Sequence, residues 1–341
     1  MTVPQFMSPV VSVLIVSYNT KELTLDCLRS VVRETQRLSY EVIVVDNASS
    51  DGSADAIAAE FPGVALIRSE QNLGFAAANN KAAQVARGAF LLLLNPDTVA
   101  LDRAIERLVL FARCTPQARI WGGRTLYGDG TLNPSSCWQR MSPWNLLCRA
   151  TGLTGLFRQS EVFNAEAYGG WRRDTVRHVD IVSGCFLLIE RRFWNDLGGF
   201  DAAFFMYGEE ADLCLRAIKL GAEPLMTPEA TIIHHGGASE RVRADKMVRL
   251  LAAKSLLIDR HFPAGQVGLG QGLLAAWPLT RTLALTVAAA LTGSRKMSES
   301  ASIWQSVWLR RAEWLGSDPS AQRRSGTPGA APKTGSTPHG A

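Results

Sequence analysis

The sequence has few cysteines, and their spacing gives them no structural role. Six are scattered over 341 residues, and none belongs to a Cys-x-x-Cys pair. This argues against a zinc ribbon, a thioredoxin-type redox site and a disulfide framework. Reduced thiols in a cytoplasmic compartment are the expectation. Glycine and proline, with 29 and 15 residues, are too few for a collagen-like or disordered chain.

Motifs of several common enzyme classes are also missing. The chain has no GxxxxGK[ST] loop and no GxSxG elbow. The glycines at 268–272 (GLGQG) follow no predicted strand and lack the spacing of a dinucleotide-binding loop. The apolar run at 10–16 has no basic region before it and is too short to cross a membrane. We therefore expect a buried strand there rather than a signal peptide.

Charge is unevenly distributed along the chain. The net charge is +5, with −4 over residues 1–240 and +9 over residues 241–341. A basic C-terminal part can meet nucleic acid or an anionic membrane surface. Its aromatic residues stand among aliphatic ones rather than in a basic groove, which favours the membrane surface and argues against nucleic acid.

The first half of the chain alternates strand and helix patterns. Strands are predicted over 10–17, 41–46, 64–68 and 90–94, and helices over 21–33, 53–61, 76–87 and 102–113. Repeated βα units imply a parallel sheet with right-handed crossovers. Ligands of such sheets bind at the carboxyl ends of the strands.

The second half is less regular. Residues 142–175 show no clear period, and no element is predicted there. Strands are predicted over 179–190 and 230–234, and helices over 209–220 and 242–261. An apolar stretch follows over 262–294, and residues 316–341 are rich in Gly, Ser, Pro and Thr, which predicts disorder.

Two acids stand directly after predicted buried strands. Asp46 lies in VVDNASSDGS (44–53), where a carboxylate can accept a hydrogen bond from a nucleobase N–H. Asp97 lies in LLLNPDT (92–98), where it can hold Mg²⁺ or Mn²⁺ against a diphosphate. The alternative for both motifs is a turn with a helix cap.

Two further groups of polar residues stand out. Glu209, Glu210 and Asp212 begin a predicted helix after an aromatic, glycine-bounded loop. A carboxylate there can act as a general base, or the acids can simply favour the helix dipole. His234 and His235 end a predicted strand and point to opposite faces, so at most one is a metal ligand, and a structural role is the alternative.

In their order along the chain, these motifs resemble the family 2 glycosyltransferases with a GT-A fold. The nearest subgroup in pattern is the bacterial rhamnosyltransferase-like enzymes of cell-surface polysaccharide assembly. The resemblance covers roughly residues 10–240. It is carried by VSVLIVSYN (11–19), VVDNASSDGS (44–53), NLGFAAANN (72–80), LLLNPDT (92–98), VSGCFLLIERRFWNDLGGFDAAFFMYGEEADLCLRA (182–217) and HHGGAS (234–239).

The resemblance implies a Rossmann-like α/β fold with a mostly parallel central sheet. It implies a catalytic domain over 1–240. Composition and charge add the expectation of a helical, basic extension over 241–315 that can associate with a membrane, and of a disordered tail over 316–341. The nucleotide-binding residues that it implies are Ser17, Asn19, Asp46, Asn47, Asn72, Gly74 and Asn79.

The resemblance also assigns roles to the acids. Asp97 and His234 would hold a divalent metal, Mg²⁺ or Mn²⁺, and Glu210 would be the catalytic base, with Glu209 or Asp212 able to share that role. The chain departs from the family pattern twice. Asn95 replaces the first acid of a metal-binding DxD motif, and the usual Glu-Asp pair is Glu-Glu.

An inverting transfer in one displacement is what the resemblance implies. The expected donor is dTDP-rhamnose, with a UDP-sugar as the alternative, and the acceptor is a saccharide, expected to be lipid-linked. The expected location is the cytoplasm or the cytoplasmic face of the inner membrane. Two rival functions are a non-catalytic binding protein on the same fold and a nucleotidyltransferase, which lacks support because no basic glycine-rich loop follows the first strand.

The apolar stretch at 267–292 has three possible roles. As a helix it reaches about 39 Å, enough to span a membrane. Arg281 and Pro278 oppose a clean span. The basic charges and Trp277, Trp304, Trp308 and Trp314 favour an anchor at the membrane interface. Packing of the helices against the catalytic domain is the remaining alternative.

Overall fold

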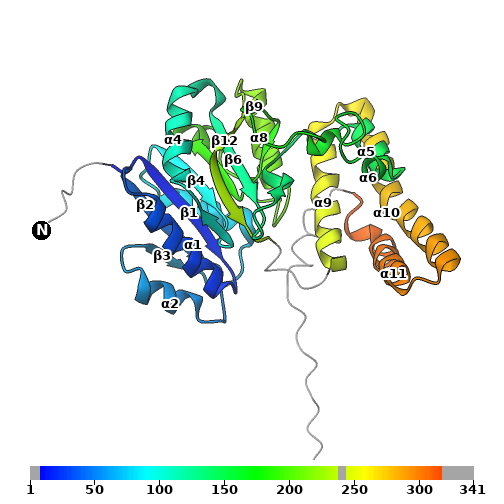
Figure 1. Ribbon diagram of the computed structural model, residues 1–341, viewed down its shortest axis with the longest axis horizontal. Coiled ribbons are helices and arrows are strands. Elements are labelled where there is room, and N and C mark those ends of the chain that lie inside the picture. Colours follow the sequence, from blue (N-terminus) through cyan, green and yellow to red (C-terminus); the bar gives the residue numbers. More distant parts are fainter. Residues whose placement is uncertain (1–7, 237–242, 317–341) are drawn as a thin grey trace, which may run out of the picture.

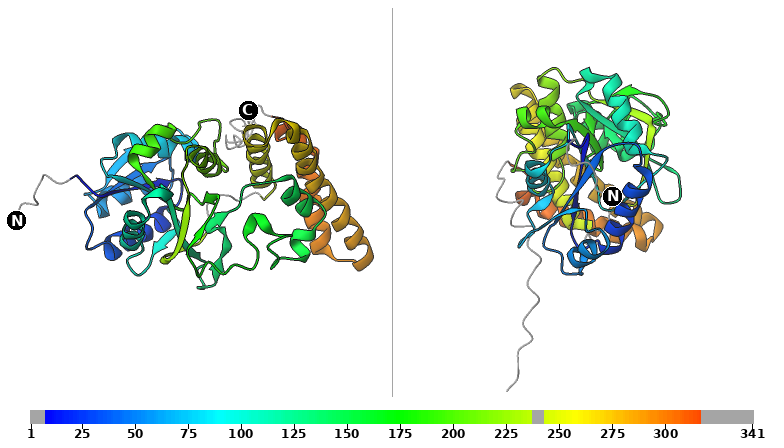
Figure 2. Two further views of the ribbon diagram at one scale, coloured as in Figure 1. Left: turned by 90° about the horizontal axis from the view of Figure 1, so that it is seen from above. Right: turned by 90° about the vertical axis from the view of Figure 1, so that its left-hand side faces the viewer.

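The computed structural model describes residues 8–236 and 243–316 of the chain. Figure 1 shows a part built on a central sheet, with a group of long helices beside it. The two further views of Figure 2 show the same arrangement, with the helical group at the end opposite the N-terminus.

The central sheet has the strand order β3–β2–β1–β4–β11–β6–β12–β5. Six of these eight strands run in the same direction, and β5 and β11 run against them. Two short strands, β7 (Leu132–Asn133) and β9 (Arg177–His178), extend the sheet, and β8 (Cys137–Trp138) pairs with β10 (Ile181–Val182). The main strands are β1 (Val11–Ser17), β2 (Tyr40–Asp46), β3 (Ala65–Arg68), β4 (Phe90–Leu94), β5 (Thr98–Ala100), β6 (Ile120–Leu126), β11 (Phe186–Glu190) and β12 (Leu225–His234).

Helices cover both faces of this sheet, which explains why β1 is apolar along nearly its whole length. Successive side chains of a strand point to opposite faces. Leu14 and Val16 therefore share a core with α3 and α8, while Val13 and Ile15 share the other core with α1 and α4. The helices of this part are α1 (Lys21–Glu34), α2 (Ser53–Glu60), α3 (Gly74–Val85), α4 (Ala104–Cys114), α7 (Arg191–Leu197) and α8 (Glu209–Lys219).

Some elements differ from the sequence-based expectation. The three-residue strand β5 is too short to show a pattern and forms because it pairs with β12. Strand β12 is longer than the predicted 230–234, and its register shift between Thr227 and Thr231 explains why the pattern is broken. Helix α4 begins at Ala104, two residues after the predicted start.

Two short helices lie in the stretch where no element is predicted, α5 (Pro143–Ala150) and α6 (Leu153–Leu156). The Ser142 side chain accepts a hydrogen bond from the Asn145 N–H at 3.2 Å, and Pro143 occupies the first turn. With eight and four residues, these helices are too short for a readable apolar period.

The C-terminal helices are α9 (Arg243–His261), α10 (Ala264–Thr292) and α11 (Arg295–Leu309). Together with α5 they enclose a third apolar core. Its fully buried members are Leu146, Ala150, Val248, Leu251, Ile258, Leu274, Trp277, Val307 and Trp314. Among the described residues, α10 is the one helix whose length and composition would allow it to cross a membrane. The predicted tail over 316–341 lies outside the described residues except for Gly316.

Candidate active site

A cavity of about 670 Å³ opens at the carboxyl ends of β1, β2 and β4. This is the edge at which parallel α/β sheets bind ligands. Its wall combines strand-end loops, the loop around β7 and β8, the start of α8, and one residue of α9. The polar and aromatic members are Tyr18, Thr20, Asn47, Asn72, Phe75, Asn95, Asp97, Tyr127, Asn133, Ser135, Trp138, Ser183, Tyr207, Glu209, Glu210, His234, His235 and Lys246.

Two of the predicted nucleotide-binding asparagines are hydrogen-bonded to each other at the wall of this cavity. Asn47, directly after β2, donates to Asn72 Oδ1 at 2.9 Å and accepts from the Leu73 N–H at 2.8 Å. Asn72 Oδ1 also accepts from the N–H of Gly74 at 2.9 Å. Gly74 has a φ of +79°, and a Cβ at this position would collide with Phe205. The start of α3 is thereby fixed against the cavity.

Four of the predicted nucleotide-binding residues are not part of the cavity wall: Ser17, Asn19, Asp46 and Asn79. Asn19 Oδ1 accepts from the Ser50 N–H at 2.8 Å, which joins the loops after β1 and β2. Ser17 and Asn79 hydrogen-bond within the interior, to Thr24 and to the Phe75 carbonyl. Asp46 is buried with one oxygen on the Ser49 N–H, while its Oδ1 has no partner among the described residues.

Asp97 and His234 meet at the end of β4 and β12. Asp97 Oδ1 lies 3.3 Å from His234 Nε2, and both side chains are largely buried. Burial by itself lowers the pKa of His234, but the hydrogen bonds to Asp97 and Cys185 and the charges of these two groups together outweigh burial and raise that pKa to about 10. Burial also opposes ionisation of Asp97, yet its bonds with His234 and nearby backbone N–H groups keep its pKa below the ordinary value. The pair is therefore an ion pair at neutral pH.

The residues present fit a divalent cation, which the structure does not contain. Within the described ranges no three His, Cys, Asp or Glu side chains gather at one point. Among the described residues, Asp97 and His234 offer a carboxylate and an imidazole, and the side-chain oxygen of Asn95 beside them is buried without a partner. Mn²⁺ and Mg²⁺ accept this donor set when a substrate's phosphate oxygens complete the coordination.

Glu209 and Glu210 form a coupled pair at the first turn of α8. Both line the cavity, and each has one carboxylate oxygen that is buried without a partner among the described residues. Burial and the charge of Glu210 raise the pKa of Glu209 well above its ordinary value. Burial also raises the pKa of Glu210. Two adjacent buried carboxylates resist double ionisation, and the pKa of Glu209 is raised the more strongly of the two.

A lysine from α9 favours the ionised form of Glu210. The positive charge of Lys254 lowers the pKa of Glu210, partly opposing the effect of burial. Lys254 itself lies 2.5 Å from Glu166 Oε1, and Arg149 holds the other oxygen of Glu166 at 2.8 Å. Burial opposes ionisation of Glu166, but these two cations lower its pKa to about 2. The sequence offers no local signal for this contact because α9 is far away along the chain.

The third predicted catalytic acid, Asp212, is not on the cavity wall. It is buried and bound from two sides, by Arg216 at 2.7 Å and by His261 at 2.9 Å. Arg216 also donates to the carbonyl groups of Leu197 and Gly199. Asp212 therefore joins α8 to the end of α9 and to the loop that follows α7.

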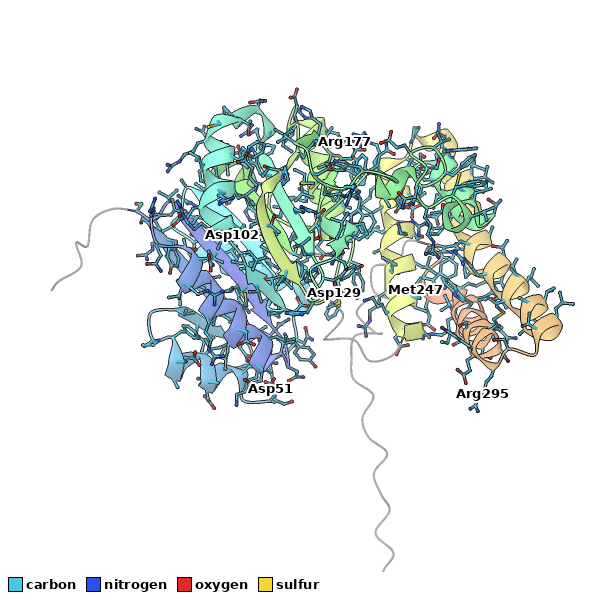
Figure 3. All side chains as sticks on the ribbon, in the orientation of Figure 1. Asp51, Asp102, Asp129, Arg177, Met247 and Arg295 are labelled. Carbon is cyan, nitrogen blue, oxygen red and sulfur yellow. The ribbon has the colours of Figure 1, made fainter. Side chains whose placement is uncertain are left out.

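Several cavity residues are absent from the sequence-based assignment. Trp138 and Ser135 reach the wall through the short strands β7 and β8, and Tyr127 through the turn between β6 and β7. Lys246 comes from the first turns of α9, where Figure 3 labels its neighbour Met247. Turn residues at 128–134 are visible in the sequence, but no pattern there reveals that they face the same cavity as Glu210.

Comparisons with known sequences agree with the geometry. Residues 12–179 match the model of Glycosyl transferase family 2. The N-acetylglucosaminyl-diphospho-decaprenol L-rhamnosyltransferase of Mycobacterium tuberculosis (strain ATCC 25618 / H37Rv) is 28% identical over 257 residues, which cover 67% of this chain and 77% of that protein. The O-antigen biosynthesis protein RfbC of Myxococcus xanthus is 27% identical over 244 residues, 70% of this chain and 18% of that protein.

Two solved structures share the fold. A mannosyltransferase, PcManGT from Pyrobaculum calidifontis, in complex with GDP-Man and Mn²⁺, gives a TM-score of 0.53 at 19% identity over 94% of this chain and 86% of that one. GalNAc-T7 with UDP, GalNAc and Mn²⁺ gives 0.50 at 16% identity, over 76% of this chain and 53% of that one. The expected GT-A fold is thus confirmed. With its motifs, fold and relatives in agreement, the chain belongs to the family 2 glycosyltransferases and is rhamnosyltransferase-like.

Proposed function

We propose that this glycosyltransferase moves a sugar from a nucleotide diphosphate to a saccharide acceptor, with inversion at the anomeric carbon. The observation that carries the proposal is the single cavity whose wall includes Glu210 together with Asn47, Asn72 and Asp97. Rhamnose from dTDP-rhamnose is the proposed donor, supported by the relationship to the mycobacterial rhamnosyltransferase. A UDP-sugar is the alternative donor.

The donor side of the reaction uses the strand-end residues. Asp46, which is buried directly before the cavity residue Asn47, keeps one oxygen without a partner among the described residues, and we assign this oxygen to a base N–H. Asp97 and His234 would hold a divalent cation, which supplies positive charge to the departing diphosphate. Because Asp97 and Cys185 raise the pKa of His234, binding of a metal there has to compete with binding of a proton.

The acceptor side uses the start of α8. Glu210 accepts the proton of the acceptor hydroxyl while that oxygen attacks the anomeric carbon and the bond to the diphosphate breaks. Glu209 stays protonated beside it and keeps a second negative charge out of the cavity. One displacement with one base inverts the anomeric centre and needs no covalent intermediate with the protein.

The acceptor is proposed to be a lipid-linked saccharide of cell-envelope polysaccharide synthesis, which would place the enzyme on the cytoplasmic face of the inner membrane. The mycobacterial relative is named for a decaprenol-linked acceptor. The basic C-terminal helices, with the long apolar helix α10, support contact with an anionic membrane.

A donor panel tests this function. Purified protein is incubated with dTDP-rhamnose, UDP-glucose and UDP-N-acetylglucosamine, with a chelator or with Mn²⁺ or Mg²⁺, and release of nucleotide diphosphate is measured. We expect metal-dependent release with one donor and transfer of that sugar with an inverted anomeric centre by NMR. Binding of a donor without release under all conditions would instead favour the non-catalytic binding protein.

A further inference from the structure

The segment from α5 to residue 163 exposes an unusual number of large apolar side chains. Leu156 is 76% exposed and Val162 is 58% exposed, and three neighbours are also exposed. We call these five residues the α5–α6 patch: Trp144, Leu147, Leu156, Phe157 and Val162. Isolated exposed apolar residues are normal, but a group of this kind marks an interaction surface.

The patch is organised around the ring of Phe163, which joins its two aromatic members. The rings of Trp144 and Phe157 lie 6.1 and 5.0 Å from that of Phe163. Trp144 also donates from its indole N–H to the Val162 carbonyl at 2.9 Å. Leu147 lies one helical turn after Trp144 and shares its face of α5.

The same segment is held in a defined conformation. Asn164 donates to the Arg158 carbonyl at 2.8 Å, and Ser160 Oγ accepts from the N–H groups of Val162 and Phe163, each at 3.2 Å. A Cβ on Gly169 would collide with the backbone of Ser160, so the loop packs directly on that glycine. The exposed apolar side chains are therefore held in place by a loop of defined conformation.

Three arginines stand directly beside this patch. Arg158 donates to the Gly155 carbonyl at 3.2 Å, and the guanidinium of Arg281 approaches within 3.8 Å of the position that a Cβ on Gly155 would take. Arg149 lies behind them, stacked on Trp277 at 4.9 Å. Figure 1 shows α5 and α6 against α10, the helix that carries Arg281.

These arginines carry more positive charge than their described surroundings neutralise. Among the described residues, Arg281 makes no ion pair, and its Nε is buried without a partner. Glu166 binds Arg149 but also Lys254, and Glu161 beside the patch binds Arg177. Burial and the charges of Arg149 and Arg158 lower the pKa of Arg281, as expected where cations meet without a counter-ion.

We propose that the α5–α6 patch docks the protein onto an anionic membrane, with the apolar side chains in the interfacial layer and Arg158 and Arg281 on lipid phosphate groups. An apolar protrusion beside unpaired arginines matches the two layers of a bilayer surface, acyl chains and phosphates. The inference deepens the membrane contact of the proposed function. It assigns that contact to α5 and α6 with one residue of α10, rather than to α10 alone.

Vesicle binding of the full-length protein tests this docking. Binding is measured by co-sedimentation with phosphatidylcholine vesicles that contain or lack phosphatidylglycerol. The arginine variant is Arg158→Gln with Arg281→Gln, and the apolar variant is Leu156→Ser with Phe157→Ser. Two matched controls lie on α4 in the sheet-containing part, the exposed Arg113→Gln and the exposed Leu110→Ser.

We expect binding only to vesicles with phosphatidylglycerol, weakened by salt. Each arginine lost should weaken it by about fivefold, and the apolar variant should weaken it by about tenfold or more. The two controls should bind like the wild-type protein. Unchanged melting temperatures and unchanged release of nucleotide diphosphate show that the variants remain folded.

Three results overturn the proposal. The first is wild-type protein that ignores anionic vesicles at low salt, or an arginine variant that binds as well as wild type. The second is calorimetric binding of inorganic phosphate, lost in the arginine variant, without vesicle binding. The third is a wild-type protein that forms a dimer but does not bind vesicles, together with an apolar variant that is monomeric. This result would make the patch an interface between two copies of the protein. Failure of sugar transfer with vesicle binding intact rejects the transfer proposal alone.

Discussion

At the scale of single residues, the proposed chemistry depends on how burial divides charge between Glu209 and Glu210. Both carboxyl groups line the cavity, and each has one buried oxygen without a partner among the described residues. The charge of Lys254 favours ionisation of Glu210, while the charge of Glu210 disfavours ionisation of Glu209. The same burial that destabilises the ionised carboxylates also makes Glu210 a stronger base than an exposed glutamate.

Substitutions of the two glutamates should separate their roles. Glu210→Gln cannot accept the proton, and we expect turnover to fall by about 10²–10⁴. Donor affinity should barely change, because this residue faces the acceptor. Glu210→Asp should give intermediate turnover, since it retracts the carboxylate by about 1 Å. Turnover is measured at saturating donor.

Glu209→Gln is the matched control on the neighbouring position. It should cost less activity and raise the melting temperature, because it removes a buried carboxyl whose pKa is raised by its neighbour. A dead Glu209→Gln beside a fully active Glu210→Gln would assign the base to Glu209. Equal and normal activity of both variants would leave the acids with a structural role only.

Asp97 and Asp46 should differ in their dependence on metal. Asp97→Ala removes one of the two proposed metal ligands, and we expect the metal-dependent part of donor affinity to disappear while the fold survives. Asp46→Ala should weaken nucleotide binding by about tenfold with or without metal, the loss expected for one hydrogen bond to a buried acceptor. Calorimetric titration with donor, with Mn²⁺ or with a chelator, distinguishes the two. Wild-type affinity of Asp97→Ala with Mn²⁺ present would reject the metal assignment.

At the scale of elements, α8 is positioned by the C-terminal helix α9. Asp212 binds His261 near the end of α9, and Lys254 in the middle of α9 lies close enough to Glu210 to affect its pKa. Arg260 adds a further tie, 2.6 Å from Asp201 in the loop before α8. The helix that carries Glu210, the proposed base, is thus held by His261 and Arg260, which follow the sheet in sequence.

Lys254→Met should shift the pH dependence of turnover to higher pH. Glu210 must be ionised to accept a proton, so turnover falls as the pH drops through its pKa. Without the Lys254 charge that pKa rises further above its ordinary value, because only the backbone hydrogen bonds still oppose the effect of burial. The pH profile of kcat is compared with that of Lys296→Met, an exposed lysine on α11. An unchanged acid limb in Lys254→Met, with normal thermal unfolding, would contradict the electrostatic role of Lys254.

At the scale of the whole molecule, the C-terminal helices and the α5 segment form one packed unit. Leu146 and Ala150 of α5 share a core with residues of α9, α10 and α11. Thr280 of α10 donates to the Ala150 carbonyl at 2.6 Å, and Arg310, directly after α11, forms an ion pair with Asp245 of α9. The extension is therefore part of the folded body, whatever surface it also presents to a membrane.

A chain that ends at His261 should be strongly destabilised. It loses α10 and α11 and exposes Leu251 and Ile258, at a cost of about 1.5–3 kcal/mol for each large buried side chain. We expect a lower melting temperature and aggregation, measured by scanning calorimetry and light scattering. A chain that ends at Gly316 keeps every described helix and is the control. Equal melting temperatures of the two chains would show that the third core contributes nothing to stability.

The sequence by itself determined the sheet, the family and the position of most chemical groups. Buried strands such as Val11–Ser17 have an unbroken apolar pattern, and polar residues placed directly after them must lie at one edge of the sheet. That local logic located Asp97 and His234 and the pair Glu209 and Glu210, all of which line one cavity. It also indicated helices throughout the C-terminal part, where α9 to α11 are found.

Only the tertiary structure decided which distant residues complete this site and which surface faces outward. Lys254, Lys246 and Trp138 reach the cavity region through long-range packing, which leaves no periodic trace in their own neighbourhood. The same holds for Asp212, whose carboxylate turns away to His261 because the rotation of α8 is set by its apolar face against the sheet. Arg281 lies beside α6 because α10 packs on α5. The sequence of a helix shows which of its faces is apolar, but it does not show which other element covers that face.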